Sequence, residues 1–378
     1  FGVSGDCGTA DASKQSNGSF AFALDHQAAI LVFQPYTSNT VLQSCYLTKV
    51  EVTSDNDITH TYTLDPTSGE LTGTGSGKQV ILTTKGSGAY VNGFPLNTTS
   101  ASVATNGAYM VIKPGTHILR VRYWIKDIAT NVEGTVTKTL SSHTYAKNTY
   151  YDMTADLNIR DYDGTKYYMW DAQKNYWNGH EWNSANPWQP VLSYNSNGNY
   201  AKNNSDARYY NESYSGYGIS NPATHSCATL PNELSWYCMY GDPRWDGDEL
   251  WTTMGHLYKG GMWFKKKSVL QAEHHYDTEK SADGTTDLRT TYKDYNNTNS
   301  SINSSLPSAV DAGNYFYLPA LGYYYSGQLY AVGNDGYYWS SSADPWGSDN
   351  AYVLSFGSGY VSVGNSYRYT GFRVGGFE

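Results

Sequence analysis

The amino-acid sequence predicts a mainly β chain of two domains, an antiparallel β-sandwich followed by an α+β domain with long loops. The first observation is a series of short apolar runs, alternating with period two between turn residues, as far as about residue 158. Such spacing is typical of an antiparallel sandwich. The second is a rise in Tyr and Trp density beyond the Asp-Tyr-Asp-Gly turn at 161–164. The third is the length of 378 residues, enough for two ordinary domains.

Residues 1–18 are rich in Gly, Ser, Asp and Thr and predict a flexible leader. The start at Phe1 is typical of a mature or trimmed terminus, so export has to be argued from composition. The sandwich is expected over residues 19–159, with no amphipathic helix of ten or more residues. Its strands are expected within 19–32, which Pro35 would end, and at 47–52, 59–64, 80–83, 109–112, 118–125, 132–140 and 149–157.

The second domain is expected over residues 160–378. Residues 175–217 are nearly all Asn, Ser, Gly, Tyr and Trp, and residues 283–305 are polar, so both predict loops. The best helix candidate is 230–239, because Pro231 suits the first helical position and Leu234 shares a face with Tyr237 or Cys238. Short strands are expected at 315–325, 336–341, 351–356, 360–363 and 371–374.

The composition favours an aromatic binding surface over a charged surface that binds nucleic acid. Charged residues make up 16% of the chain and the net charge is -9, which argues against a nucleic-acid partner. The chain has 37 Tyr and 11 Trp against 10 Phe, so its rings are mostly amphipathic. Tyr with Ser, Gly and Asn is also the composition of antibody paratopes. The alternative is a loop-rich bacterial surface protein with a wet aromatic surface and no particular ligand.

The four Cys residues form no C-x-x-C pair, so a zinc ribbon or thioredoxin-type motif is unsupported. Cys227 and Cys238 are close in sequence and could pair in an oxidising compartment. They could equally be two small buried hydrophobes. No run of 18 apolar residues occurs, so no transmembrane helix is predicted.

Three segments of the second half share one pattern. The first, 230–236, is a Leu-Pro start into a helix with an inner Trp; the second, 336–342, is a strand carrying a Trp; the third, 351–374, ends in Gly-Phe-Arg-Val. Together they resemble the C-type-lectin-like fold in its formylglycine-generating-enzyme-like branch, over roughly residues 165–378. The same module is similar to the display domain of variable proteins diversified by retroelements. The resemblance implies a recognition domain.

The first half resembles fimbrillin-like and pilin-like domains of Gram-negative gut bacteria. The matching features are the strand at 29–33, the alternating run at 47–52, and Gly-Thr-His at 115–117 leading into the strand at 120–125. The resemblance implies an exported protein at the cell surface, either anchored to the outer membrane or associated with a pilus. The first half would then be attached to the cell or pilus and the second half would face outward.

Calcium-dependent sugar binding is not expected. The Glu-Pro-Asn and Gln-Pro-Asp signatures of calcium-dependent C-type lectins are missing, because the run at 189–191 is Gln-Pro-Val and lacks the carboxylate that a hard cation needs. A structural calcium stays open at one acidic cluster, although solvated loop charges suit it better. The cluster consists of Asp242, Asp246, Asp248 and Glu249.

Catalysis is not expected either. Formylglycine chemistry needs reactive Cys near the C-terminus, and no Cys lies beyond Cys238. His274 and His275 are adjacent, so on a strand they would point to opposite faces and could not share a metal ion. Glu233 is a candidate acid only in the loosest sense, and a Glu in the first turn of a helix explains it better. We therefore expect no catalytic residue, no metal and no cofactor.

The hypothesis of a binding protein rests on the C-terminal loops, where the residue types of binding hot spots are dense. Trp339, Phe356 and Phe372 are expected in the core. The ligand-binding residues are expected to be Tyr337, Tyr338, Trp346, Asn350, Tyr352, Tyr360, Asn365, Tyr367, Arg368 and Tyr369.

The leading hypothesis is a non-catalytic adhesin or pilus-associated protein that presents these loops to an extracellular glycan or protein ligand. The second is a structural pilus subunit that assembles with other pilus subunits by strand donation. The third is a carbohydrate-active enzyme, which requires two carboxylates about 5 to 10 Å apart in a cleft. None of the three involves nucleic acid, and a membrane is involved only through an anchor outside the given sequence.

Overall fold

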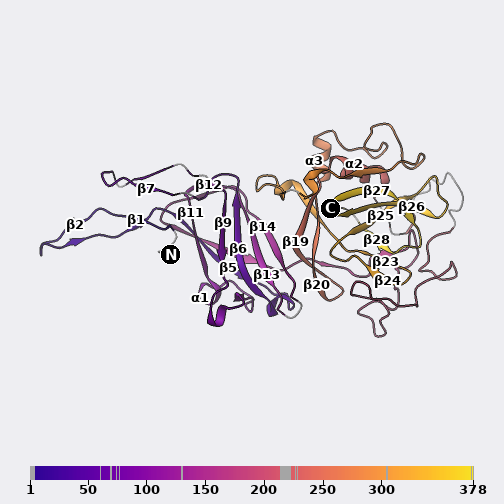
Figure 1. The fold of residues 1–378 in the computed structure, drawn as a ribbon, viewed down its shortest axis with the longest axis horizontal. Helices are drawn as coiled ribbons and strands as arrows, with labels where there is room; N and C mark the ends of the chain where they lie inside the picture. The colour runs from indigo at the N-terminus through magenta and orange to yellow at the C-terminus, as the bar shows by residue number, and fades with distance from the viewer. Residues whose placement is uncertain are drawn as a thin grey trace. The chain divides into compact units, whose positions relative to one another are not determined.

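The computed structural model describes the chain except for residues 1–4, 60, 69, 74, 76, 129–130, 213–222, 226, 228, 304, 376 and 378. The chain divides into two compact units. Unit 1 consists of Phe1–Ile159 with Ser308–Ala312, and unit 2 of Arg160–Pro307 with Gly313–Glu378. Both units are built mainly from strands, and their helices are short (Figure 1). Among the described residues, no helix has the length and apolar character needed to cross a lipid bilayer.

The larger strands of unit 1 form two sheets. One contains β10 (Phe94–Pro95), β6 (Tyr46–Ser54), β13 (Leu119–Lys126) and β14 (Glu133–Thr139) in that order, and β9 (Gln79–Thr83) also pairs with β6. The other has the order β11 (Ala108–Ile112), β5 (Ala29–Tyr36), β16 (Thr149–Asp156). The rings of Phe33 on β5 and Tyr123 on β13 meet edge-on at 6.1 Å, which joins the two sheets across a common core. The smaller elements are β7 (Thr63–Leu64), β8 (Leu71–Thr72), β12 (Gly115–His117), β15 (His143–Tyr145) and α1 (Val103–Asn106).

Most of the predicted runs form strands. Among the described residues of the run predicted at 59–64, only Thr63–Leu64 form a strand, β7. Two further differences lie on β5. Strand β16 pairs with β5 in parallel, so this sheet is mixed and not purely antiparallel. Pro35 does not end β5, which continues to Tyr36. The reason is that β11 pairs with β5 only as far as Phe33, so Pro35 lies beyond the part of β5 that has a partner on that side. A Pro is tolerated where no ladder hydrogen bond is needed.

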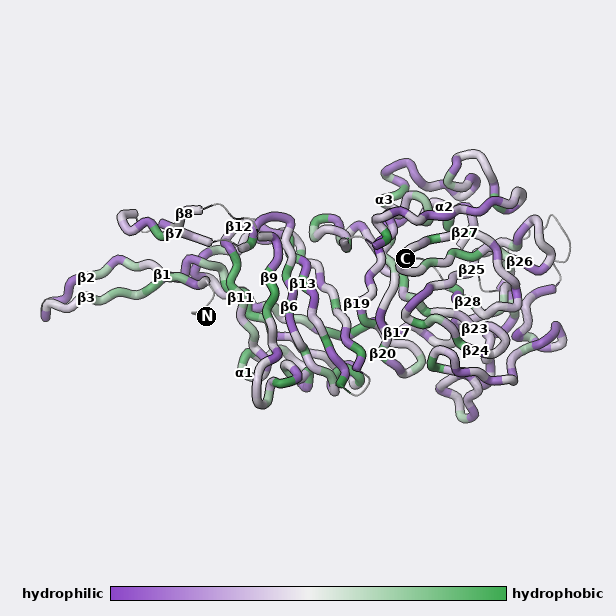
Figure 2. The backbone as a smooth tube through the Cα atoms, in the orientation of Figure 1, coloured by the Kyte–Doolittle hydropathy of each residue, from purple (hydrophilic) through white to green (hydrophobic). Residues whose placement is uncertain are grey.

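Residues 8–26 form a two-stranded arm, although the sequence predicts a flexible leader over 1–18. Strand β1 (Gly8–Thr9) pairs with β4 (Asp25–His26), and β2 (Ser13–Lys14) pairs with β3 (Phe20–Ala21), so the arm extends from the sandwich as a hairpin (Figure 1). Along its second strand Phe20, Phe22 and Leu24 are 62%, 64% and 60% exposed. Figure 2 shows this strand as largely hydrophobic.

Unit 2 is built on a six-stranded sheet with the order β18 (Tyr167–Tyr168), β28 (Phe372–Arg373), β25 (Gly336–Ala343), β26 (Asn350–Gly357), β27 (Tyr360–Tyr367), β21 (Tyr295–Asn297). Strands β19 (Arg244–Thr253), β20 (His256–Lys265) and β22 (Tyr315–Pro319) pair antiparallel in that order, and β17 (Asp161–Tyr162) lies parallel to β19. A separate hairpin consists of β23 (Tyr323–Tyr325) and β24 (Gln328–Tyr330). The helices are α2 (Pro231–Tyr240) and α3 (Lys267–Ala272).

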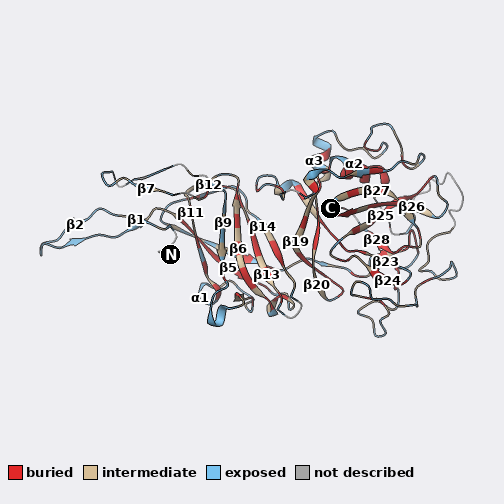
Figure 3. Cartoon of the chain, viewed as in Figure 1, coloured by how far each residue is buried: buried red, intermediate tan, exposed pale blue. Residues whose placement is uncertain are grey.

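The predicted helix is confirmed as α2. Pro231 is its first residue, and Leu234 and Cys238 are fully buried. Figure 3 shows that much of α2 is buried. The thiol of Cys238 donates to the carbonyl oxygen of Val361 on β27 at 3.4 Å, which places α2 on this sheet. Glu233 accepts the N–H of Leu230 at 2.9 Å and so satisfies one of the donors left free at a helix start.

The long polar segments contribute more to the core than their composition predicts. Residues 175–212 form neither helix nor strand, as expected, yet Tyr176 and Trp177 are each 1% exposed. In the segment expected as an exposed loop over 283–305, Leu288 and Ile302 are fully buried and Tyr295 begins β21. In each of these Asn- and Ser-rich loops, a few apolar or aromatic side chains are therefore buried in the core and hold the loop against it.

Candidate functional site

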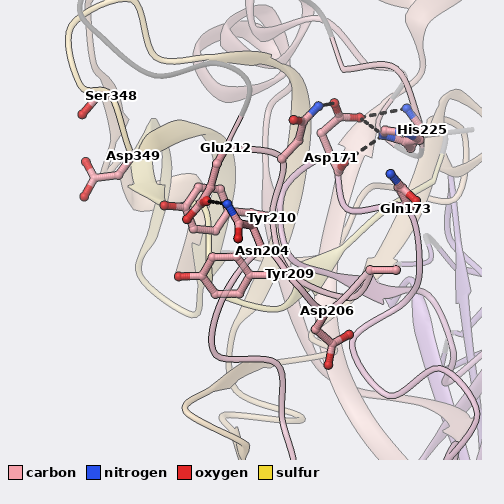
Figure 4. Close-up of a pocket in the computed structure, with 12 residues that line it drawn as sticks. Asp171, Gln173, Asn204, Asp206, Tyr209, Tyr210, Glu212, His225, Ser348 and Asp349 are labelled. Atoms are coloured by element: carbon pink, nitrogen blue, oxygen red, sulfur yellow. Dashed lines mark hydrogen bonds and ion pairs between the residues drawn. The ribbon is translucent and has the colours of Figure 1, made fainter.

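Unit 2 contains a polar cavity of about 880 Å³, which we call the tyrosine–acid pocket. Its walls come from four parts of the sequence: the turn after β18, the loop over 204–212, His225, and the loop between β25 and β26 (Figure 4). Four carboxylates line it and, among the described lining residues, no Lys or Arg does. The lining consists of Asp171, Gln173, Asn204, Asp206, Ala207, Tyr209, Tyr210, Asn211, Glu212, His225, Ser348 and Asp349.

Asp171 fixes one wall of the pocket. It lies in the left-handed region at φ 54 and is fully buried. Its carboxylate accepts the backbone N–H groups of Thr224 at 2.7 Å and His225 at 2.8 Å, and the side-chain amide of Asn211 at 3.0 Å. A buried carboxylate needs such donors because desolvation is costly. Asp171 is thus a structural residue that holds His225 and Asn211 in place.

Tyr209 and Tyr210 supply the aromatic surface of the pocket. Their ring centroids are 4.6 Å apart, and Figure 4 shows the two rings side by side. Burial raises the pKa of Tyr210 to about 12, with smaller contributions from the neighbouring Tyr209, Glu212 and Asp349. Its hydroxyl therefore stays protonated near neutral pH and can donate a hydrogen bond to a ligand.

The loop 344–350, which joins β25 to β26 and includes Asn350, the first residue of β26, is held by several hydrogen bonds. The backbone N–H of Trp346 donates to the carboxylate of Asp344 at 2.7 Å, and the N–H of Asp344 donates to the carbonyl oxygen of Asn350 at 3.1 Å. Arg368 lies beneath the loop with its guanidinium 5.0 Å from the ring of Trp170. Its Nε donates to the same Asn350 oxygen at 2.9 Å, and its backbone N–H donates to the backbone carbonyl oxygen of Asp349 at 2.9 Å. Asp349 is thereby held at the pocket wall.

Two of the residues predicted from the sequence lie next to this wall. The rings of Tyr367 and Tyr369 are stacked at 5.1 Å, and Tyr325 lies 6.0 Å from Tyr369. Burial raises the pKa of Tyr369 to about 12, with smaller contributions from Tyr325, Tyr367 and Asp349. Arg368, which lies between Tyr367 and Tyr369 in sequence, is hydrogen-bonded through its backbone N–H to the carbonyl oxygen of Asp349, so this ring cluster lies beside the tyrosine–acid pocket. Tyr367 is 50% exposed and Tyr325 is 40% exposed, so the cluster is open to solvent.

Three predicted ligand-binding side chains are buried, which corrects their expected position. Tyr338 is 7% exposed, and Tyr352 and Arg368 are fully buried. Tyr338 donates its hydroxyl hydrogen to the carbonyl oxygen of Pro319 at 2.7 Å, and the hydroxyl of Tyr352 accepts the N–H of Lys293 at 3.3 Å. Both faces of the β25–β26 part of the sheet are covered, so side chains that alternate along these strands are mostly buried on either face. Trp339, Phe356 and Phe372 are buried as predicted.

The remaining predicted residues divide between two ends of the sheet. Tyr360 begins β27 and Tyr367 ends it, so roughly 23 Å separates them at about 3.3 Å per residue. Tyr337 and Tyr360 lie together with Asp335 at the far end, where burial raises the pKa of Asp335. Asn350 and Asn365 lie at the pocket end, where Asn365 donates to Asp344. One ligand pocket cannot include both groups.

Three members of the acidic cluster, Asp246, Asp248 and Glu249, lie on β19, and Asp242 lies just before it, paired with Arg244 at 2.9 Å. Asp246 is 2% exposed and accepts the N–H groups of Asp248 at 3.1 Å and Glu249 at 3.2 Å and the indole N–H of Trp263 at 3.1 Å. It therefore closes the bulge between Asp246 and Leu250 and is not a solvated loop charge. Within the described part of the chain, no group of three or more His, Cys, Asp or Glu could hold a metal ion.

The other candidates have structural positions. The carboxylate of Glu233 lies near the helix start and also accepts from the hydroxyl of Tyr276. His274 and His275 were expected on a strand, but they follow the end of α3. Cys227 and Cys238 are thiols in two different buried clusters, so the disulfide that their spacing allowed is not formed.

The sequence did not predict the pocket-lining residues before 230. Tyr209, Tyr210 and Glu212 lie in a run of polar residues without periodicity, which predicts loops but not which of them converge. The available signal was the density of Tyr and Asn over 175–217, the same signal that pointed to the C-terminal loops.

The fold and the pocket define a mainly β, two-unit protein with a polar, aromatic site. No protein-family model matches the chain, and no curated protein matches it in sequence. Three solved structures resemble it distantly. A "putative cell adhesion protein" of Bacteroides fragilis NCTC 9343 is 15% identical, with a TM-score of 0.25 over 40% of this chain and 53% of its own. One of Bacteroides ovatus ATCC 8483 is 12% identical, with a TM-score of 0.23 over 41% of this chain and 56% of its own.

The third is a fimbrial protein of Bacteroides ovatus ATCC 8483, 10% identical, with a TM-score of 0.17 over 97% of this chain and 73% of its own. The chain spans about half the length of the two cell adhesion proteins. The distant resemblance is to Bacteroides proteins described as a "putative cell adhesion protein" or a "fimbrial protein", and it specifies no ligand. The predicted resemblance to C-type-lectin-like domains is not among these findings and stays a prediction.

Proposed function

We propose that the chain is a non-catalytic adhesin, exported to the cell surface, that binds a neutral or amino-sugar glycan in the tyrosine–acid pocket. The observation that carries the proposal is the lining of this pocket. Carboxylate and amide side chains converge there with the paired rings of Tyr209 and Tyr210. Such a set offers many hydrogen-bond acceptors and donors and one apolar surface.

A sugar suits this lining better than a protein surface does. A pyranose has hydroxyl groups that can donate to carboxylates and an apolar ring face that can lie against Tyr. A protein partner usually needs a broader contact, of about 800 Å² on each side. The pocket is concave and polar, and Arg208 pairs with Asp206 at 2.7 Å, so Glu212 and Asp349 remain to attract hydrogen-bond donors.

The charges of the pocket limit the class of glycan. Asp349 is exposed, and Glu212 is hydrogen-bonded to the neutral Asn204. A sialylated or uronic-acid glycan would bring a further carboxylate near these groups, and like charges disfavour binding. A protonated amino sugar would be attracted. The proposal therefore includes neutral and amino sugars and excludes acidic ones.

The test is a glycan array probed with the full chain, containing neutral, amino-sugar and sialylated glycans. We expect binding to neutral or amino-sugar glycans, and we expect Tyr209→Ala and Asp349→Asn each to weaken it roughly tenfold, about 1.4 kcal/mol. Tyr194→Ala is the control, because Tyr194 is 69% exposed in unit 2 but lines no part of this pocket.

Two outcomes would overturn the proposal. The first is the absence of binding to every neutral and amino-sugar glycan on the array. The second is cleavage of a bound glycan, detected by mass spectrometry after incubation, because a non-catalytic adhesin leaves its ligand intact.

A further inference from the structure

The loop 344–350 separates the tyrosine–acid pocket from a second depression. That depression has a volume of about 410 Å³ and is lined by Thr290, Thr291, Tyr292, Pro345 and Trp346. We call it the Trp346 shelf. Ser348 and Asp349 of the same loop line the tyrosine–acid pocket, so one short loop contributes to both.

Trp346 is exposed on a rigid support. Its side chain is 64% exposed, although a Trp normally buries most of its surface. Its backbone is fixed by the hydrogen bond from its N–H to Asp344, which is itself fully buried. The ring lies 5.2 Å from that of Tyr292, at an interplanar angle of 40°. Because the backbone of Trp346 is fixed and its ring contacts Tyr292, little conformational entropy is lost when the side chain binds a ligand.

The surroundings of Trp346 suit a sugar ring. Tyr292 stacks on the buried Tyr352 at 6.0 Å, and its hydroxyl donates to Asp294 at 2.6 Å, so its position is also fixed. Thr290 and Thr291 are exposed and carry hydroxyl groups beside the two rings. Two aromatic faces with hydroxyl groups at their edge can hold the apolar face and the hydroxyls of a pyranose together.

The two depressions are close enough for one ligand. Consecutive Cα atoms are 3.8 Å apart, so the Cα atoms of Trp346 and Asp349 are at most roughly 11 Å apart. The loop also turns back on itself, because the N–H of Asn350 donates to Gly347 at 3.4 Å. A few linked sugar units can therefore cross the loop from one depression to the other.

We infer that the Trp346 shelf is a second sugar subsite and that the ligand is an oligosaccharide that crosses the loop 344–350. This inference rests on the proposed function, since it extends the same glycan beyond the tyrosine–acid pocket. A monosaccharide occupies the pocket alone, and a longer chain gains a stacking contact on Trp346. Chain length, and not only sugar type, then sets affinity.

The experiment is isothermal titration of the full chain with the monosaccharide and the tetrasaccharide of the neutral or amino sugar that gives the strongest array signal. The wild type is expected to bind the tetrasaccharide at least tenfold more tightly than the monosaccharide. Trp346→Ala is expected to remove most of this preference while leaving monosaccharide affinity unchanged. Trp346→Phe, which keeps an aromatic face, should restore part of it, and Tyr194→Ala should change neither affinity.

The outcomes separate the inference from the function on which it rests. If Trp346→Ala keeps the full preference for the tetrasaccharide while Tyr209→Ala abolishes binding, the shelf is not a subsite and the pocket assignment stands. If the wild type binds neither saccharide, the proposed function itself fails. Since Trp346 is exposed, its replacement should leave the circular-dichroism spectrum and the thermal transition unchanged, which verifies folding.

Discussion

At the scale of single residues, Tyr side chains lie both in the core and at the surface of this chain. Tyr352 is fully buried, and its hydroxyl is satisfied by the backbone of Lys293. Tyr367 is 50% exposed and stacks on Tyr369. The hydroxyl allows both, because it can bond to backbone in the core or to water and ligand outside. Residue type alone therefore could not separate the core rings from the surface rings among the ten predicted residues.

Asp283 is a surface carboxylate with an unusual number of donors. It accepts the N–H groups of Thr285 at 2.9 Å and Thr286 at 2.8 Å, the Thr286 hydroxyl at 2.6 Å, and the ammonium of Lys293 at 2.8 Å. Partial desolvation acts to raise the pKa of Asp283, but the hydrogen bonds from Lys293 and Thr286 outweigh it and hold the pKa well below its usual value.

Replacement of Asp283 by Asn is expected to lower the free energy of unfolding by about 1 kcal/mol at pH 7. The folded-state pKa lies below the unfolded value of about 3.9, so this stabilisation is present above that pH and is lost as the pH falls through the folded pKa. Urea unfolding of both proteins from pH 7 down to pH 2 should show the difference shrinking. A difference that stays constant with pH would contradict the role of the charge.

At the scale of elements, hydropathy patterns predicted the strands and the helix whose sequences are periodic and missed the segments without periodicity. The alternating runs over 47–52 and 118–125 became β6 and β13, and the Leu-Pro start became α2. The β19–β20 hairpin was missed because a bulge of acidic residues interrupts β19 after Asp246. The tyrosine–acid pocket was missed because its walls meet only through the tertiary fold, and a polar run has no period that reveals its neighbours.

Asn232 on α2 fastens two polar segments to the core, and its loss provides a test at this scale. It is fully buried; its amide donates to Thr278 and Asp287, both at 3.0 Å, and its oxygen accepts the N–H of Leu288 at 2.9 Å. Asn232→Leu removes the acceptor of the buried Leu288 N–H and one donor each to Thr278 and Asp287, so we expect a loss of about 1 to 3 kcal/mol in chemical denaturation.

The matched control is Asn178→Leu, at an exposed position, which should change stability by less than about 0.5 kcal/mol. An unchanged unfolding midpoint for Asn232→Leu would mean that the segment around Leu288 is held by other contacts.

At the scale of the whole molecule, each unit has its own core and neither depends on a covalent cross-link. Ile30, Leu31 and Phe33 are fully buried in unit 1, and Phe264, Leu354 and Phe356 are fully buried in unit 2. Chains of this length bury enough apolar surface to fold without disulfides. The four Cys residues can accordingly remain thiols, in agreement with the second of the two alternatives that the sequence left open for Cys227 and Cys238.

Thiol counting tests this arrangement over the entire chain. Cys7 is exposed, whereas Cys45, Cys227 and Cys238 are 1%, 7% and 0% exposed. Burial raises the pKa of Cys45 to about 11 and that of Cys238 to about 12, so neither forms the reactive thiolate near pH 8. With Ellman's reagent at pH 8, one thiol per chain should react in the native protein and four after denaturation without reductant. Cys7→Ser should abolish the reaction of the native protein and leave three reactive thiols after denaturation. Two thiols in the denatured, unreduced chain would instead reveal a disulfide, and the burial of Cys227 and Cys238 in separate clusters would then be wrong.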